Sequence, residues 1–323
     1  MEKKLVQYSV VSIHSLSSVS FPCHSVAHAF RPTRVDAFTG TAFKGNPAAV
    51  CILEEEREEE WLQAVAREFN FSETCYLTRA SGSELAGELS PRFRLRWFTP
   101  VEEVDLCGHA TLAAAHILLT SGMVDSDTIE FMTLSGILTA KRVPEMKSSD
   151  ISKIQGGDVP GIWIELNFPV VPIAEDDDAE RISSVSKVLN GTSIIEIKKT
   201  AKDDHFIVIP SAKEVEEFQP QFEEIQRCPG GSIIITGLAQ PDSGFDFVSR
   251  SFAPKFGLNE DPVSGSAHCS LAPYWSEKLG KNELVAYVAS SRGGVVKVCL
   301  DEQNQRVALR GKAVTVMRGS LLA

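Results

Sequence analysis

Glu73 is the residue of this sequence that is best placed to move protons. It stands between Ser72 and Thr74 at the start of a predicted apolar strand. A carboxylate partly withdrawn from water can accept and release protons near neutral pH. A strand-edge glutamate paired with a surface cation is the alternative, and the residues alone leave both interpretations open. The acidic runs at residues 54–60 and 175–178 are different, because we expect their side chains to be solvated at the starts of helices.

Two turns that contain Gly108 and Gly265 come at the starts of predicted helices. The first N–H groups of a helix have no partner within it, so a helix start can hold an anion. If the two turns face each other, the space between them suits a substrate that carries a carboxylate. Tight turns between strand and helix, without any ligand, are the alternative.

Other candidate chemistry has weaker support. Cys107 lies two residues from His109, which could bring a thiol nucleophile to a base but does not require it. His109 and His116 share one helix face, where a buried histidine is commoner than a metal ligand. Pro262 replaces the first glycine of a Gly-x-Ser-x-Gly motif around Ser264, so the sequence does not support the nucleophile turn of an α/β-hydrolase. The seven cysteines form no CxxC pair, and no nucleotide-binding loop is present, so we expect no metal and no cofactor.

The elements that must position these residues occur twice. The first set comprises strands at 46–53, 72–78 and 93–98 with helices at 61–69 and 111–119; the second comprises strands at 206–209, 232–236 and 245–252, a weakly helical segment at 212–225 and a helix opening at 261–267. Arg96 and Phe98 recur as Arg250 and Phe252, each 154 residues later. The positions that match Glu73 hold no acid in the second set. The sequence therefore predicts an α+β fold of two similar units that carries one base.

The predicted boundaries follow from composition. Residues 1–34 are rich in serine and form a predicted disordered extension, residues 35–150 the first unit and residues 160–319 the second. The last strands, 295–300 and 313–317, could return to either unit. We expect a cytoplasmic protein, or a plastid or mitochondrial one if residues 1–34 are a transit peptide.

Composition excludes some classes of protein. The chain has 323 residues and a net charge of −11, so it lacks the basic footprint of a nucleic-acid binder. No apolar stretch approaches the length of a spanning helix, so we expect no membrane partner. The expected partner is a small carboxylate-bearing molecule, and formation of a homodimer is left open.

Four motifs in order resemble the phenazine biosynthesis PhzF-like family. They are Asp36-Ala37-Phe38-Thr39 with Gly45-Asn46-Pro47-Ala48-Ala49-Val50, Phe71-Ser72-Glu73-Thr74, Phe98-Thr99-Pro100 with residues 103–111, and residues 260–267. The resemblance implies a diaminopimelate-epimerase-like fold: two pseudo-symmetric domains, each a β-barrel-like sheet around a central helix. It also implies an isomerase that uses neither cofactor nor metal and binds its substrate between the domains.

The resemblance assigns roles to particular residues. Glu73 is the expected catalytic acid–base group, while His109, Asp261, Ser266, Gly108 and Gly265 are the expected substrate-binding residues. One alternative is a two-base racemase, in which Cys107 would be one base but Ser264 would replace the second thiol. A binding protein without catalysis, built on the same scaffold, is the other alternative.

Overall fold

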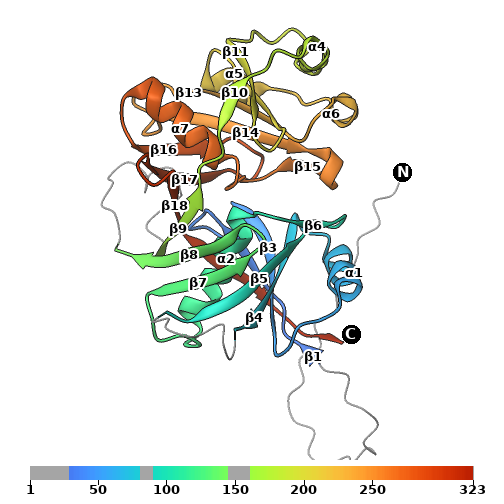
Figure 1. Cartoon of the computed structure of the whole chain (residues 1–323), viewed down its shortest axis with the longest axis vertical. Coiled ribbons are helices and arrows are strands. Elements are labelled where there is room, and N and C mark those ends of the chain that lie inside the picture. Colours follow the sequence, from blue (N-terminus) through green and yellow to red (C-terminus); the bar gives the residue numbers. More distant parts are fainter. Residues whose placement is uncertain (1–28, 81–89, 145–160, 323) are drawn as a thin grey trace, which may run out of the picture.

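The computed structural model describes residues 29–80, 90–144 and 161–322. Two units lie one above the other in Figure 1, with the blue-to-green unit below the yellow-to-orange one. Each unit wraps a curved sheet around a helix. The predicted α+β class and the predicted duplication are confirmed by the order and pairing of the elements.

The order and pairing of the elements in the first unit recur in the second. The first contains β2 (Thr33–Ala37), β3 (Asn46–Leu53), α1 (Glu59–Phe69), β4 (Glu73–Arg79), β5 (Arg92–Phe98), β6 (Glu103–Val104), α2 (Gly108–Thr120), β7 (Thr128–Thr133) and β8 (Gly136–Val143). The second contains β12 (His205–Val208), α5 (Ala212–Glu217), α6 (Phe222–Arg227), β13 (Ile233–Leu238), β14 (Phe247–Ala253), a 3-10 turn (Pro254–Phe256), β15 (Leu258–Asp261), α7 (His268–Leu279), β16 (Glu283–Val288) and β17 (Gly294–Asp301). The parallel pairs β3–β4 and β5–β7 correspond to β12–β13 and β14–β16.

The recurring arginines occupy equivalent positions. Arg96 of β5 makes a two-pronged ion pair with Glu103 of β6, with Nε 2.7 Å from Oε1. Arg250 of β14 holds Glu260 of β15 in the same way, also at 2.7 Å. The repeat seen in the sequence is therefore a repeat of side-chain contacts as well as of strands.

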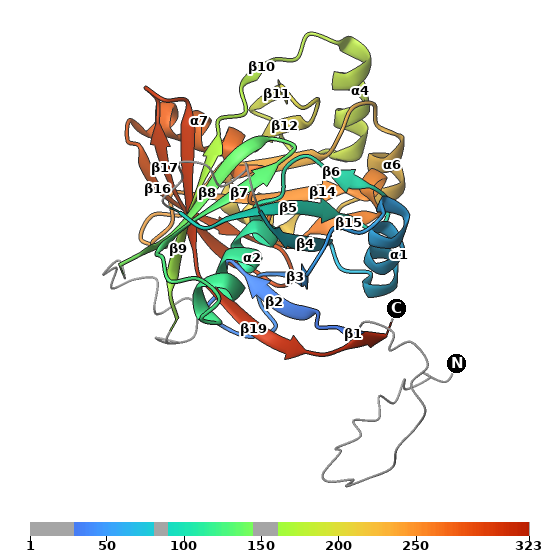
Figure 2. The same ribbon diagram turned by 60° about the horizontal axis from the view of Figure 1, so that its bottom comes forward.

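The remaining strands complete one sheet that spans both units. They are β9 (Trp163–Pro169), β10 (Ile173–Glu175), β11 (Glu196–Thr200), β18 (Arg306–Gly311) and β19 (Ala313–Arg318). Antiparallel pairing of β9 with β18 connects the units, and β19 returns to pair with β2 of the first unit (Figure 2). The strand at 294–301 instead stays with β16 of the second unit. A continuous apolar core therefore includes residues of both units.

The helix α2 lies at the centre of the first unit. All of its residues from Gly108 to Leu119 are buried, and it contacts strands on several sides. A helix that is apolar all round must be enclosed rather than laid on a surface. The helix α7 is likewise mostly buried and packs on β16, β17 and β18.

Three predictions need correction. The sequence predicts a disordered extension up to residue 34, but β1 (Ala29–Phe30) pairs with β20 (Leu321–Leu322), and β2 begins at Thr33. Residues 1–28 lie outside the described part.

The second correction concerns residues 212–225, predicted as one weakly helical segment. They form two short helices, α5 and α6. Pro220 lies between them, and a proline disfavours helical backbone at the residue before it.

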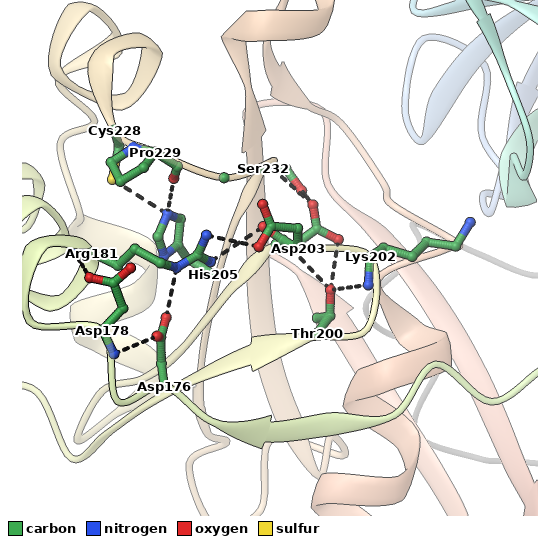
Figure 3. A network of polar contacts seen from close by, with 12 residues as sticks. Asp176, Asp178, Arg181, Thr200, Lys202, Asp203, His205, Cys228, Pro229 and Ser232 are labelled. Carbon is green, nitrogen blue, oxygen red and sulfur yellow. Dashed lines mark hydrogen bonds and ion pairs between the residues drawn. The ribbon is translucent and has the colours of Figure 1, made fainter.

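The third correction concerns the acids at residues 175–178. Asp178 caps α4 (Ala179–Val188), as expected for a helix start. The side chain of Asp176, however, is fully buried and lies 3.0 Å from Nε of Arg181, which also contacts Asp203 (Figure 3). Burial raises the pKa of the Asp176 carboxyl, but hydrogen bonds and the charge of Arg181 outweigh it, so this pKa is lowered. Asp176 is thus part of an internal network and not a solvated acid.

Acid should destabilise this fold through two buried histidines. Burial lowers the pKa of His116 on α2, and of His268 on α7, to about 4. Between about pH 6.5 and pH 4 the unfolded chain binds more protons at these sites, so the free energy of unfolding falls as pH falls. Each histidine contributes a slope of about 1.4 kcal/mol per pH unit. His205, whose pKa burial also lowers, adds to this slope, whereas Asp261, whose pKa burial raises to about 6, and His109, whose pKa is raised beside Glu73, oppose it.

Denaturant melts at pH 7, 6 and 5 measure this slope. We expect the midpoint to fall with pH at an unchanged m value. His268 Nδ1 contacts the Ser264 carbonyl at 2.7 Å, and the amide of His268→Asn can still donate a hydrogen bond to this oxygen. The variant should reduce by about one the number of protons taken up on unfolding, so its stability should depend less on pH. A variant with the full wild-type slope would contradict the assignment.

Candidate active site

Glu73 is the first residue of β4 and pairs in register with Ala48 of the parallel strand β3. Its side chain is 12% exposed. The carboxylate oxygen Oε2 lies 3.0 Å from His109 Nε2, and within the described ranges it has no aligned hydrogen-bond donor. This is a close ionic contact that leaves the carboxylate free to accept a proton.

His109 is the second residue of α2, and its side chain is 2% exposed. Nε2 lies 3.1 Å from Ser72 Oγ as well as near Glu73, and Nδ1 lies 3.5 Å from Cys107 Sγ. Burial lowers the pKa of His109, but the negative charge of Glu73, 3.0 Å away, outweighs it, so this pKa is raised. The imidazole and the Glu73 carboxylate therefore favour an ion pair.

Asp261 is the last residue of β15 in the second unit, and it is connected to Glu73 and His109 by hydrogen bonds of two residues of the first unit. Asn46 Nδ2 donates to Asp261 Oδ1 at 2.5 Å and to the Val263 carbonyl at 3.0 Å. Ser72 Oγ in turn donates to Asn46 Oδ1 at 2.9 Å. A chain of contacts thus runs from Asp261 through Asn46 and Ser72 to His109 and Glu73, and it crosses between the units.

The two glycine turns meet at the same boundary. A Cβ placed on Gly108 would lie 2.7 Å from the Cα of Gly265, and one placed on Gly265 would lie 2.8 Å from the Cα of Gly108. Only residues without a side chain allow this approach. The predicted face-to-face arrangement of the two turns is present, which brings the starts of α2 and α7 together.

Ser266 is the one predicted binding side chain, glycines aside, that stays apart from this chain of contacts. Its Oγ lies 3.4 Å from Ser264 Oγ, and within the described segments it makes no hydrogen bond to Glu73, His109 or Asp261. It still belongs to the Gly265 turn, so a ligand bound beside the two turns would lie near it.

Sequence reasoning gave no role to Asn46 or Ser72. Both stand in the quoted motifs, and Ser72 directly precedes Glu73. A polar residue next to a buried carboxylate is a usable signal, since buried polar groups need partners. Asn46 could not be found in this way, because its partner Asp261 is 215 residues away in the sequence.

Within the described residues, a metal ion could be held only by Glu73, Cys107 and His109, and only if the Cys107 thiol lost its proton. Ligand atoms of Glu73, Cys107 and His109 lie within 4.8 Å of one another, and no other such group occurs in the described ranges. Burial, followed by the charge of Glu73, raises the pKa of the Cys107 thiol well above its usual value. A thiol binds metal as the thiolate, so this environment opposes ligation.

Cys107→Ser should keep most of the activity. The buried Cys107 stays a thiol for the reason just given, and a serine hydroxyl can also donate to His109 Nδ1. Steady-state kinetics on the purified variant test this expectation. A loss of several hundred-fold, about 3.5 kcal/mol of barrier, would instead identify Cys107 as a base and support the racemase alternative.

The comparisons with known proteins agree with the motifs. The family model of phenazine biosynthesis-like proteins, PhzC-PhzF, matches residues 35–319. The chain is 43% identical over 290 residues to an uncharacterized isomerase of Halalkalibacterium halodurans, covering 89% of this chain and 97% of that protein. It is 38% identical over 301 residues to phenazine biosynthesis-like domain-containing protein 1 of Mus musculus, with the same coverage of 89% and 97%.

Solved structures share the fold. A PhzF-family protein of Enterococcus faecalis matches with a TM-score of 0.74 at 34% identity, covering 91% of this chain and 100% of that one. A hydroxyproline epimerase of Agrobacterium vitis matches with a TM-score of 0.58 at 11% identity, covering 91% of both, which shows likeness of fold alone. In the described part of the chain, no helix is both long and apolar enough to cross a membrane.

Proposed function

The chain belongs to the phenazine biosynthesis-like (PhzC-PhzF) family, and from this premise we propose that it is a cofactor-independent isomerase of the PhzF type. Its substrate is a small molecule with a carboxylate, bound in the cleft between the two units. Glu73 moves a proton from one carbon of the substrate to another. The observation that carries this proposal is the buried Glu73–His109 pair beside the meeting point of two helix starts.

The substrate carboxylate binds to the backbone N–H groups at the Gly108 and Gly265 turns. Such amides and the positive ends of the helix dipoles favour an anion. Binding there places the carbon next to the carboxylate near Glu73. Asp261 and Ser266 line the second unit's side of the site and orient the rest of the substrate.

Glu73 then acts as base and acid in turn. Its carboxylate takes a proton from the first carbon, and the electron pair of that C–H bond shifts along the adjacent double bond. The carboxyl of Glu73, with this proton or with one exchanged from solvent, then forms a new C–H bond two carbons away and becomes a carboxylate again. Only a proton and an electron pair move within the substrate, so the reaction needs no redox partner.

One base is sufficient for this shift, because the proton is removed and delivered on the same face of the substrate. A two-base racemase would need a second group opposite the first. Position 264 holds a serine, which is too weak an acid for that role. The raised pKa of Cys107 keeps this residue a protonated thiol, so it is not available to accept a proton. These features favour the isomerase over the racemase.

Deuterium incorporation tests the proposal. Cyclic β,γ-unsaturated acids, beginning with cyclohex-2-ene-1-carboxylic acid, are incubated with the protein in D₂O and analysed by mass spectrometry and NMR. We expect deuterium uptake and a shifted double bond with at least one acid of the series. Exchange confined to the α-carbon of amino acids, with inversion, would support the racemase; binding of the acids without any exchange would support the non-catalytic alternative.

A further inference from the structure

We infer that Asn46 and Ser72 are positioning residues that set the tautomer of His109, so that Nε2, the ring nitrogen 3.0 Å from Glu73 Oε2, always carries a hydrogen. The tautomer follows from hydrogen bonds of the resting protein. Its consequence for catalysis rests on the proposed function. The argument runs from the second unit inward along the chain of contacts that begins at Val263 and Asp261.

The orientation of the Asn46 amide is determined by the Val263 carbonyl. This oxygen can only accept, and it lies 3.0 Å from Asn46 Nδ2. Turning the amide over would place Asn46 Oδ1 against the Val263 carbonyl with no hydrogen between the two oxygens. The other hydrogen of Nδ2 is donated to Asp261 Oδ1. Asn46 Oδ1 must therefore face Ser72.

The direction of the Ser72 hydroxyl follows. Ser72 Oγ lies 2.9 Å from Asn46 Oδ1 and 3.0 Å from the Pro47 carbonyl, and both of these oxygens only accept. The hydroxyl has one hydrogen, which is used toward these two acceptors. Toward His109 Nε2, 3.1 Å away, Ser72 Oγ can only accept. His109 must therefore carry a hydrogen on Nε2 in its neutral form as well as in its charged form.

The other ring nitrogen fits this assignment. Cys107 is a protonated thiol for the reason given above, and its S–H can donate to an unprotonated Nδ1 at 3.5 Å. When the ring is charged, Nδ1–H can donate to the sulfur instead. Both protonation states of His109 are accommodated at Nδ1, while Nε2 remains a donor throughout.

A fixed Nε2–H determines where the proton from the substrate can go. Glu73 Oε2 is 3.0 Å from Nε2, but this nitrogen already carries a hydrogen and cannot accept another. The proton taken by Glu73 therefore cannot pass to His109, and it reaches solvent only by direct exchange from the 12% exposed carboxyl. Once Glu73 takes the proton, its charge no longer favours the charged ring; in the neutral ring, loss of the Ser72 acceptor would allow the Nδ1–H tautomer, and Glu73 could then lose its proton to Nε2 and to solvent.

Nitrogen NMR of the resting protein tests the tautomer without any substrate. In protein with ¹⁵N-labelled histidine, His109 is assigned by its disappearance in His109→Gln, and spectra are recorded at alkaline pH, where the ring is neutral. We expect a single Nε2–H tautomer in the wild type and in Ser72→Thr, and a mixture in Ser72→Ala. Ser270→Ala is the matched control, because it removes another buried hydroxyl that bonds a backbone carbonyl, at Ala267. An Nδ1–H tautomer in the wild type, or an unchanged tautomer in Ser72→Ala, would overturn the inference.

Isotope retention tests the consequence. With cyclohex-2-ene-1-carboxylic acid deuterated at C1, or whichever acid of the series turns over, in H₂O, we expect Ser72→Ala to lower the deuterium retained at C3 of the product. Its kcat should fall roughly tenfold while KM stays within about twofold. Unchanged retention in Ser72→Ala would overturn the consequence. If the wild type turns over no acid of the series, the proposed function fails, and the NMR result still decides the tautomer.

Discussion

Glu73→Gln should lower kcat by at least roughly 10³- to 10⁴-fold, the upper part of the range for general acid–base catalysis. The amide keeps the shape of the side chain and can still contact His109, but it cannot take a proton from carbon. The second unit has no acid at the matching positions, where Gly231 and Ser232 stand, so the repeat supplies no second copy of this base. Substrate affinity should change little, the pattern expected when an interaction of the transition state is lost.

Turnover and binding of the same purified variant, measured by product formation and calorimetry, separate catalysis from folding. Glu73→Asp withdraws the carboxylate by one methylene and should retain a small remnant of activity. Glu130→Gln is the matched control, since Glu130 is a similarly buried strand glutamate that pairs with Arg92 at 2.5 Å away from the site. It should alter stability and leave kcat unchanged. A Glu73→Gln variant within tenfold of the wild type would remove Glu73 as the catalyst.

Gly265→Ala should disable the site by forcing the two units apart. The new methyl group would lie 2.8 Å from the Cα of Gly108 and 3.2 Å from both the Gly108 carbonyl carbon and the ring of Phe38. Backbone cannot move aside as a flexible side chain can, so the starts of α2 and α7 must separate. Overpacking of this kind costs roughly 1–3 kcal/mol of stability or more. A displacement of about 1 Å in the site can lower the rate by about 100-fold.

Thermal melts and kinetics of the Gly265→Ala protein measure both effects. Gly319→Ala serves as the control, because a Cβ there meets nothing within 4 Å and should be neutral. The reciprocal variant Gly108→Ala should behave like Gly265→Ala, since the contact is mutual. Wild-type activity and melting temperature in either variant would show that the two turns do not need this close approach.

The repeated architecture could be predicted from the amino-acid sequence. Local apolar patterns mark most strands and helices, and recurrence of Arg96 and Phe98 as Arg250 and Phe252 marks the duplication, because equivalent positions in two copies face equivalent packing constraints. Gly108 and Gly265 were found in the same way. Their role in the close approach of two backbones follows from the absence of a side chain, which is a property of the residue type.

The contacts between polar groups, in contrast, depend on the folded arrangement of distant segments. Asp176 belongs to an acidic run in the sequence, yet its burial depends on Arg181 and on the fold around it. Residues 29 and 30 were assigned to the extension because their partners, residues 321 and 322, are at the other end of the chain. Asn46 meets Asp261 across 215 residues, and the direction of each hydrogen bond in that chain depends on acceptors supplied by both units. Local sequence patterns report burial and periodicity along one segment, whereas hydrogen-bond partners and protonation are set by distances between segments that exist only after folding.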